Sequence, residues 1–227
     1  MTITTTWLIR AAGIAAAIAG AIFIGVQINH PSLDASSIAT TDVVVRNTLK
    51  VLMAALALVG ITGIYLRQVE KIGLLGLVGY VLFAVGYFTM LGIEFVGAFV
   101  LPTVAPDAPA YVNDVLAAAT NGNVIGDIGP MQTVILITGI AYLAGGFVFG
   151  IALFRANVLA RWAAALLAGG SLLTIAASIL PQYQRLFAIP IGVALVGLGL
   201  SLWRGQRTAS SETVPSVRTS KLNPAGV

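Results

Sequence analysis

The hydrophobic positions of this chain form six long, nearly uninterrupted runs separated by short polar stretches. An apolar run of about 20 residues is long enough to cross a bilayer as an α-helix. Inside lipid, the backbone polar groups must be satisfied within the segment, which favours helix for every run. The pattern therefore predicts an all-α, integral membrane helical bundle, with spans at about 7–29, 43–66, 72–100, 131–154, 158–180 and 186–203.

The predicted spans are bounded by residues that start or stop helices. Pro31 and Pro102 are expected to end the first and third helices, because the residue before a proline disfavours helical geometry. Asp42 is a candidate N-cap for the second helix. From residue 206 onward the chain is rich in Ser, Thr and Pro and lacks periodicity. We therefore predict one transmembrane domain at 1–205 and a disordered cytoplasmic tail at 206–227.

Composition agrees with a membrane protein. Hydrophobic residues make up 58% of the chain and charged residues 9%, whereas a soluble domain carries about 25% charged residues. The chain has no cysteine and one histidine, which excludes thiolate sites and multi-histidine metal or haem sites. We therefore expect neither a metal nor a cofactor.

The basic residues predict the orientation of the chain. Cytoplasmic loops are enriched in Lys and Arg, and nine of the 12 basic residues fall on one side of the predicted spans. This places both termini in the cytoplasm of a multi-pass protein of the inner, cytoplasmic cell membrane. The net charge of +4 is thus explained by topology, and we expect no nucleic-acid partner. The nine residues are Arg10, Arg67, Lys71, Arg155, Arg161, Arg204, Arg207, Arg218 and Lys221.

The longest connection, 101–130, is expected to lie on the outer side as a lid-like segment. Asp107 and Pro109 predict the start of a short helix that ends near Asn121-Gly122. Its apolar residues gather on one face, as in helices that lie at a membrane interface. The segment either covers a cavity or simply lies on the lipid headgroups.

Charges inside spans are the best pointers to function in a membrane protein. Arg46 and Lys50 lie four residues apart on one helix face, and Asn47 adjoins them. Counting residues from the cytoplasmic ends of the helices places Glu94 at a similar depth. Glu94 would pair with Arg46 or Lys50 and join two helices, or stay unpaired as a proton donor. Two cations beside one anion would leave a positive charge for an anionic ligand.

Further polar side chains are expected at the same outer level. We predict an outward-facing polar pocket beneath the 101–130 segment. Arg46, Asn47, Lys50, Tyr87, Asp127 and Gln132 are the candidate ligand-binding residues, His30 and Asp114 are further candidates, and Glu94 is the candidate catalytic acid.

Small residues recur at helix-packing intervals. Ala12, Ala16 and Gly20 are spaced by four, as are Gly146 and Gly150, and this spacing lets helix backbones approach closely. Such faces would serve internal packing or a homodimer. A short sequence similarity between residues 13–23 and 139–149 would fit a weak 3+3 inverted repeat, an arrangement found in transporters.

Several stretches carry a family resemblance: 150–163, Glu94 to Val96, Leu101-Pro102 and Leu202 to Arg204. In these stretches the chain resembles uncharacterised multi-pass membrane proteins of actinobacteria. The resemblance implies a six-helix membrane protein with no established activity, and it carries over no functional residue.

Three functions fit these observations. The first is binding or transport of a small anionic or amphipathic ligand, such as a membrane lipid or an isoprenoid, through the outer pocket. The second is an intramembrane enzyme in which Glu94 acts as a general acid, for example in metal-free cyclisation or isomerisation of a terpenoid. The third is a structural or accessory subunit in which the charges only join helices.

Overall fold

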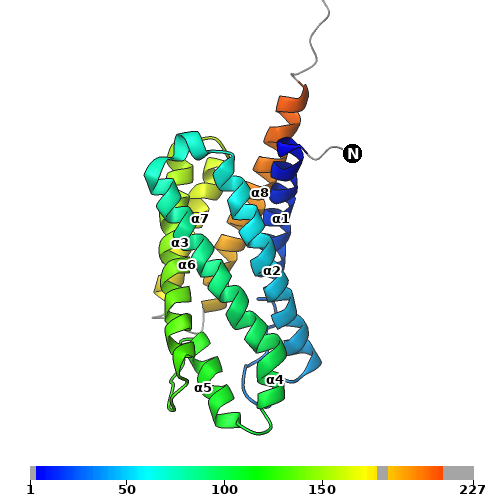
Figure 1. Ribbon diagram of the computed structural model, residues 1–227, viewed down its shortest axis with the longest axis vertical. Helices are drawn as coiled ribbons and strands as arrows, with labels where there is room; N and C mark the ends of the chain where they lie inside the picture. Colours follow the sequence, from blue (N-terminus) through cyan, green and yellow to red (C-terminus); the bar gives the residue numbers. More distant parts are fainter. Residues whose placement is uncertain (1–3, 178–183, 212–227) are drawn as a thin grey trace, which may run out of the picture.

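The computed structural model describes residues 4–177 and 184–211, and every regular element within them is helical. Each long helix packs on its neighbour in the chain, α3 packs on α6, and α1 packs on α8, so that the helices form a closed bundle (Figure 1). The long helices are α1 Thr5–Gly25, α2 Thr41–Leu66, α3 Val69–Phe95, α6 Pro130–Ala156, α7 Arg161–Ala177 and α8 Gln184–Ser211.

Five helical segments of the described chain are long and apolar enough to cross a membrane. This confirms the prediction of an all-helical bundle with membrane-spanning character. The fifth predicted run is helical as α7, but its described part has 17 residues, and residues 178–180 lie outside the described ranges. The number of six spans and the cytoplasmic termini remain predictions. The five segments are Thr5–Gly25, Thr41–Leu66, Val69–Val104, Pro130–Ala156 and Leu186–Gly205.

Three helix boundaries differ from the sequence prediction. α1 ends at Gly25, several residues before Pro31. The N-cap of α2 is Thr40, and Asp42 lies in the first turn, where it pairs with Arg46 instead. Pro102 does not end the third span: after α3 the chain passes through the π-helix η1, Val96–Val100, into α4, Leu101–Val104. Proline is tolerated there because the first turn of a helix does not need its N–H group.

The last helix is longer than expected. α8 continues to Ser211, whereas the prediction ended it at 203 and placed a disordered tail from 206. No glycine or proline interrupts residues 206–211, so the helix has no local signal to stop. The rest of the predicted tail, 212–227, lies outside the described residues.

The two ends of the bundle differ. The start of α1 and the end of α8 lie at one end, and α4 and α5, Pro109–Ala119, lie at the other (Figure 1). We call the latter the α5 end; it is the end that the charge pattern predicts to be outside the cell.

A separate small core holds α5 against the bundle. Val112, Val115 and Leu116 on α5 are buried against Ile38 and Leu101, among other apolar side chains. Burying such a cluster stabilises the segment through the hydrophobic effect. The predicted helix of the lid-like segment is therefore present and is packed in place.

Hydrogen bonds reinforce this core. The Asn113 side chain accepts from the Ala35 N–H at 2.8 Å and thereby ties α5 to the loop between α1 and α2. The Asp114 carboxylate accepts from the N–H groups of Ile125 and Gly126 at 2.9 and 3.0 Å. The loop between α1 and α2 and the segment that follows α5 are thus both held to α5 by its polar side chains.

The small-residue faces serve packing inside the chain. A methyl group added at Gly60 of α2 would lie 2.6 Å from the Ala16 side chain, and one added at Gly20 would lie 2.9 Å from Val196. These faces are therefore occupied, and the predicted homodimer would need a different surface. The similarity between 13–23 and 139–149 is only partly matched in the packing: Gly20 and Gly146 are both closely packed, whereas Gly13 packs on α8 and Gly139 has no atom within 4 Å of an added methyl group.

Candidate functional site

An ion pair joins α2 to α3 near the α5 end. The Lys50 Nζ lies 3.5 Å from the Glu94 Oε2 and donates to the Asn47 Oδ1 at 3.3 Å. Lys50 and Asn47 share a helix face, since they are three residues apart. The structure thus brings together three of the predicted site residues, with Lys50 as the partner of Glu94.

Asn47 also supplies a hydrogen bond to a backbone carbonyl of the third span. Its Nδ2 donates to the Gly97 carbonyl at 3.2 Å. In the π-helix the N–H of Leu101 bonds to Val96, and Pro102 has no N–H, so the Gly97 carbonyl lacks its usual partners in the helix. A buried carbonyl without a partner is costly, and the Asn47 amide removes that cost.

Arg46 does not join the pair. Its Nε lies 3.0 Å from the Asp42 carboxylate, and its Nη1 donates to the carbonyl oxygens of Ile28 at 2.9 Å and Val26 at 3.4 Å. These carbonyls follow the end of α1, where a cation is favourable for the helix dipole. Among the described side chains, Arg46 and Lys50 therefore each have their own carboxylate, and these two cations leave no surplus positive charge beside Glu94.

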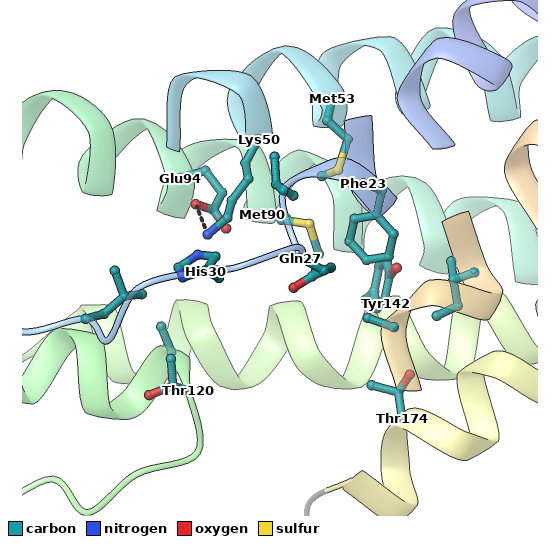
Figure 2. A pocket seen from close by; sticks show the side chains of 15 residues that line it. Phe23, Gln27, His30, Lys50, Met53, Met90, Glu94, Thr120, Tyr142 and Thr174 are labelled. Atoms are coloured by element: carbon teal, nitrogen blue, oxygen red, sulfur yellow. Dashed lines mark ion pairs between the residues drawn. The ribbon is translucent and has the colours of Figure 1, made fainter. Parts of the chain in front are cut away.

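A cavity of about 250 Å³ lies beside the ion pair. Lys50, Glu94 and His30 lie at one end of it, and Phe23 and Tyr142 lie at the other (Figure 2). The two ends differ because of the positions of the lining residues along the helices. Met53 is one turn beyond Lys50 on α2, and Met90 is one turn before Glu94 on α3, so both methionines lie deeper in the bundle than the ion pair. The first cavity therefore has its charged side chains toward the α5 end, and its deeper part is lined mainly by apolar and aromatic side chains, with Gln27 and Thr174 among the polar lining residues. The remaining lining residues are Val26, Gln27, Leu33, Met53, Met90, Ala119, Thr120, Thr174, Ala188 and Ile191.

A second cavity, of about 280 Å³, adjoins the first. Both are lined by Met90, Glu94, Ala119, Tyr142 and Thr174. The second is otherwise lined mainly by apolar residues of α3, α5 and α6, and Glu94 is the one charged residue among its described lining residues. Glu94 and Tyr142 therefore lie at the border of two spaces.

Tyr87 lies beneath the site rather than in it. Its ring is fully buried and packs edge-on against Tyr142, with centroids 5.3 Å apart, and against Phe83 at 4.8 Å. Within the described residues, the buried hydroxyl groups of Tyr87 and Tyr142 have no hydrogen-bond partner. Tyr142, rather than Tyr87, is the tyrosine that borders the two cavities.

Three predicted site residues lie outside the cavities, and two of them have local structural roles. Asp127 accepts from the Gly129 N–H at 2.7 Å, just before α6. Gln132 is exposed in the first turn of α6, and Asp114 holds the 125–126 backbone. None of the three lines either cavity. By contrast, His30 does line the first cavity, and its Nδ1 lies 2.9 Å from the Pro31 carbonyl oxygen.

Most of the apolar lining could not be found in the sequence. Phe23, Met53 and Met90 occur in long apolar runs, where a lining residue and a core residue look the same. Within the described residues, no group of three or more His, Asp or Glu side chains is placed to hold a metal ion. Comparison with protein families, curated proteins and solved structures found no match to this chain.

Proposed function

We propose that this chain is a membrane protein that binds an amphipathic molecule in the two adjoining cavities. The observation that carries the proposal is the polarity of the first cavity, with the Lys50–Glu94 pair and His30 at one end and Phe23 and Met53 in depth. Ligand sites are mostly apolar with a few placed polar groups. A polar headgroup would lie at the ion pair and an apolar chain would lie in the depth.

The pairing of charges favours a particular headgroup. Lys50 is balanced by Glu94, and Arg46 by Asp42. A purely anionic group would add a negative charge that no described side chain at these pairs compensates, whereas a zwitterionic or hydroxyl headgroup can bond to both partners at once. We therefore propose a zwitterionic or neutral amphiphile and give the anionic ligand lower rank.

Binding is best tested with the purified protein in nanodiscs and a fluorescent lysophosphatidylcholine as the probe. Decyl phosphate and farnesol serve as unlabelled competitors for anionic and neutral headgroups. We expect saturable binding that lysophosphatidylcholine or farnesol displaces at lower concentration than decyl phosphate. Displacement by decyl phosphate alone would contradict the proposed headgroup class.

A pair of variants on α5 provides the control. Ala119 lines both cavities, whereas Ala110 is exposed on the same helix and lines neither. Ala119→Phe should fill part of the site and weaken probe binding by about tenfold or more, equivalent to about 1.4 kcal/mol. Ala110→Phe should bind like the original chain. Equal binding by both variants would place the probe elsewhere.

The enzyme alternative rests on a different observation. The rings of Phe23 and Tyr142 border the same cavity as Glu94, and aromatic faces attract cationic centres. A carboxylic acid beside such rings suits proton-initiated cyclisation or isomerisation of a terpenoid. Product formation from an isoprenoid alcohol or epoxide, abolished by Glu94→Gln, would support this reading. Tight binding without turnover would support the binding protein.

The cellular setting is part of the same proposal. We infer an inner-membrane location with cytoplasmic termini from the basic residues at the end opposite α5. Under this orientation the site lies in the outer half of the bilayer. A cysteine-accessibility assay at Ala110 and Arg10 in intact cells tests it: Ala110→Cys should react with an impermeant maleimide, and Arg10→Cys should not.

A further inference from the structure

The packing of α3 against α6 changes along their length. In the half away from α5 the backbones are in close contact through glycines. A methyl group added at Gly79 would lie 2.5 Å from the Phe149 nitrogen, and one added at Gly86 would lie 2.6 Å from the Tyr142 Cα. Such distances leave no room for a side chain between the helices.

Beyond Tyr142 the two helices separate. Gly139 on α6, which is one turn from Tyr142 and lines the second cavity, has no atom within 4 Å of an added methyl group. From there α3 leads through η1 into α4, away from α6, and α5 lies between the diverging ends (Figure 1). Asn47 donates to the Gly97 carbonyl of the π-helix, so this part of the third span is held against α2.

The second cavity occupies the space where the helices separate. It is lined by Ile93 and Glu94 of α3, by Thr138 and Gly139 of α6, and by Ala118 of α5, among others. We call this space the α3–α6 gap. Because the second cavity shares Glu94 and Met90 with the first, the gap leads toward the ion pair.

The gap opens onto an apolar surface. Gly139 is itself exposed, and it lies between Ile137 and Ile140, which are also exposed, with Leu136 nearby on the same helix. In a span, such side chains face lipid. The environment immediately outside the gap is therefore the hydrocarbon of the bilayer and not water.

We propose that the ligand is a lipid that enters sideways from the bilayer through the α3–α6 gap. Its hydrocarbon chain passes Gly139 and lies in the second cavity, and its headgroup lies at the Lys50–Glu94 pair in the first. This inference rests on the proposed binding function and adds the route and the class of ligand. Small side chains at Gly139 and Ala118 leave the passage open, and the α5 core covers it from the aqueous side.

Two glycines allow a matched test. Gly139→Leu would place a side chain in the gap, and Gly92→Leu would place the same side chain on α3 outside both cavities. Each site has free space, so both variants should fold with thermal unfolding temperatures close to that of the original chain. Association of the fluorescent lysophosphatidylcholine should be slowed by about tenfold or more in Gly139→Leu and changed by less than about twofold in Gly92→Leu.

The outcomes separate this inference from the proposed function. If Ala119→Phe abolishes binding but Gly139→Leu associates at the original rate, the gap is not the route and the site still stands. If the original chain binds no probe, the proposed function itself fails. If the two glycine variants slow association equally, entry through the gap is overturned.

Photo-cross-linking of the unaltered protein avoids any folding defect in a variant. A lysophosphatidylcholine with a diazirine in its chain should label Thr138 and Met90, which line the cavities, and excess unlabelled lipid should remove that label. Labelling confined to Leu136 and Ile140, which are exposed on the outside of α6, would overturn the proposal.

Discussion

Lys50 and Glu94 form an ion pair between neighbouring helices, with 3.5 Å between the Nζ and Oε2 atoms, at the border of two cavities. Their side chains keep 15% and 22% of their exposure, respectively. The pair is thus sheltered but reachable from the cavity. An ion pair that served only to join helices could be fully buried by packing. The Lys50–Glu94 pair is instead accessible from the cavity, and this accessibility is the reason to relate the pair to ligand binding.

The first prediction concerns the ion pair itself. Replacing Glu94 by Leu leaves Lys50 without its carboxylate, and we expect a loss of stability of about 1–3 kcal/mol, reduced from a fully buried pair by partial exposure. The double variant Lys50→Leu/Glu94→Leu should recover part of this loss, because no charge remains unpaired. Thermal unfolding of the three proteins measures the difference. A double variant less stable than Glu94→Leu would contradict this account.

A second prediction separates Arg46 from the site. Arg46→Gln removes the contacts with Asp42 and with the carbonyls after α1. Hydrogen bonds to charged groups contribute about 1.5–3 kcal/mol, and partial exposure lowers this value. We expect a lower unfolding temperature with unchanged lysophosphatidylcholine affinity. A loss of affinity at unchanged stability would place Arg46 in the binding site.

The third prediction tests the role of Asn47. Asn47→Leu leaves the Gly97 carbonyl without a donor and Lys50 without the Asn47 oxygen. An unsatisfied buried group costs about 1–3 kcal/mol. We therefore expect a clear loss of stability, measured by thermal unfolding. As a control, Thr48→Leu on the adjacent exposed position should change stability little, since its hydroxyl bonds only within the helix.

The fourth prediction concerns pH at the α5 end. The hydroxyl of Ser36 and the N–H of Ser37 donate to the Asp34 carboxylate, and these bonds hold the pKa of Asp34 below its ordinary value. Because the folded-state pKa is lowered, the stabilisation is present above the unfolded-state pKa of about 3.9 and is lost as pH falls through the folded-state pKa.

Carboxyl ¹³C NMR titration of Asp34 measures this effect. We expect a midpoint below the ordinary value, and Ser36→Ala should move it upward. The turn that Asp34 organises includes Ala35, whose N–H donates to Asn113 of α5, so acid should also increase hydrogen exchange in α5. An Asp34 midpoint at the ordinary value would contradict the prediction.

Local sequence patterns were sufficient for most of the fold. The apolar runs predicted long helices because a bilayer leaves the backbone no alternative, and Pro109 correctly predicted the start of α5. They failed at Pro102, because whether a proline ends a helix depends on the turn before it. There, a π-helix and the Asn47 side chain from another helix let the span continue.

For the site, the sequence determined which residues must find partners, and the tertiary structure decided which partners they find. Arg46, Lys50 and Glu94 stand out because charge in an apolar run requires compensation. Which cation pairs with Glu94 depends on how α2 packs on α3. In the observed packing Lys50 pairs with Glu94, and Arg46 pairs with Asp42. The cavities depend on where α3 and α6 part, which is set by contacts between distant glycines and backbones. No pattern within a single helix contains that information.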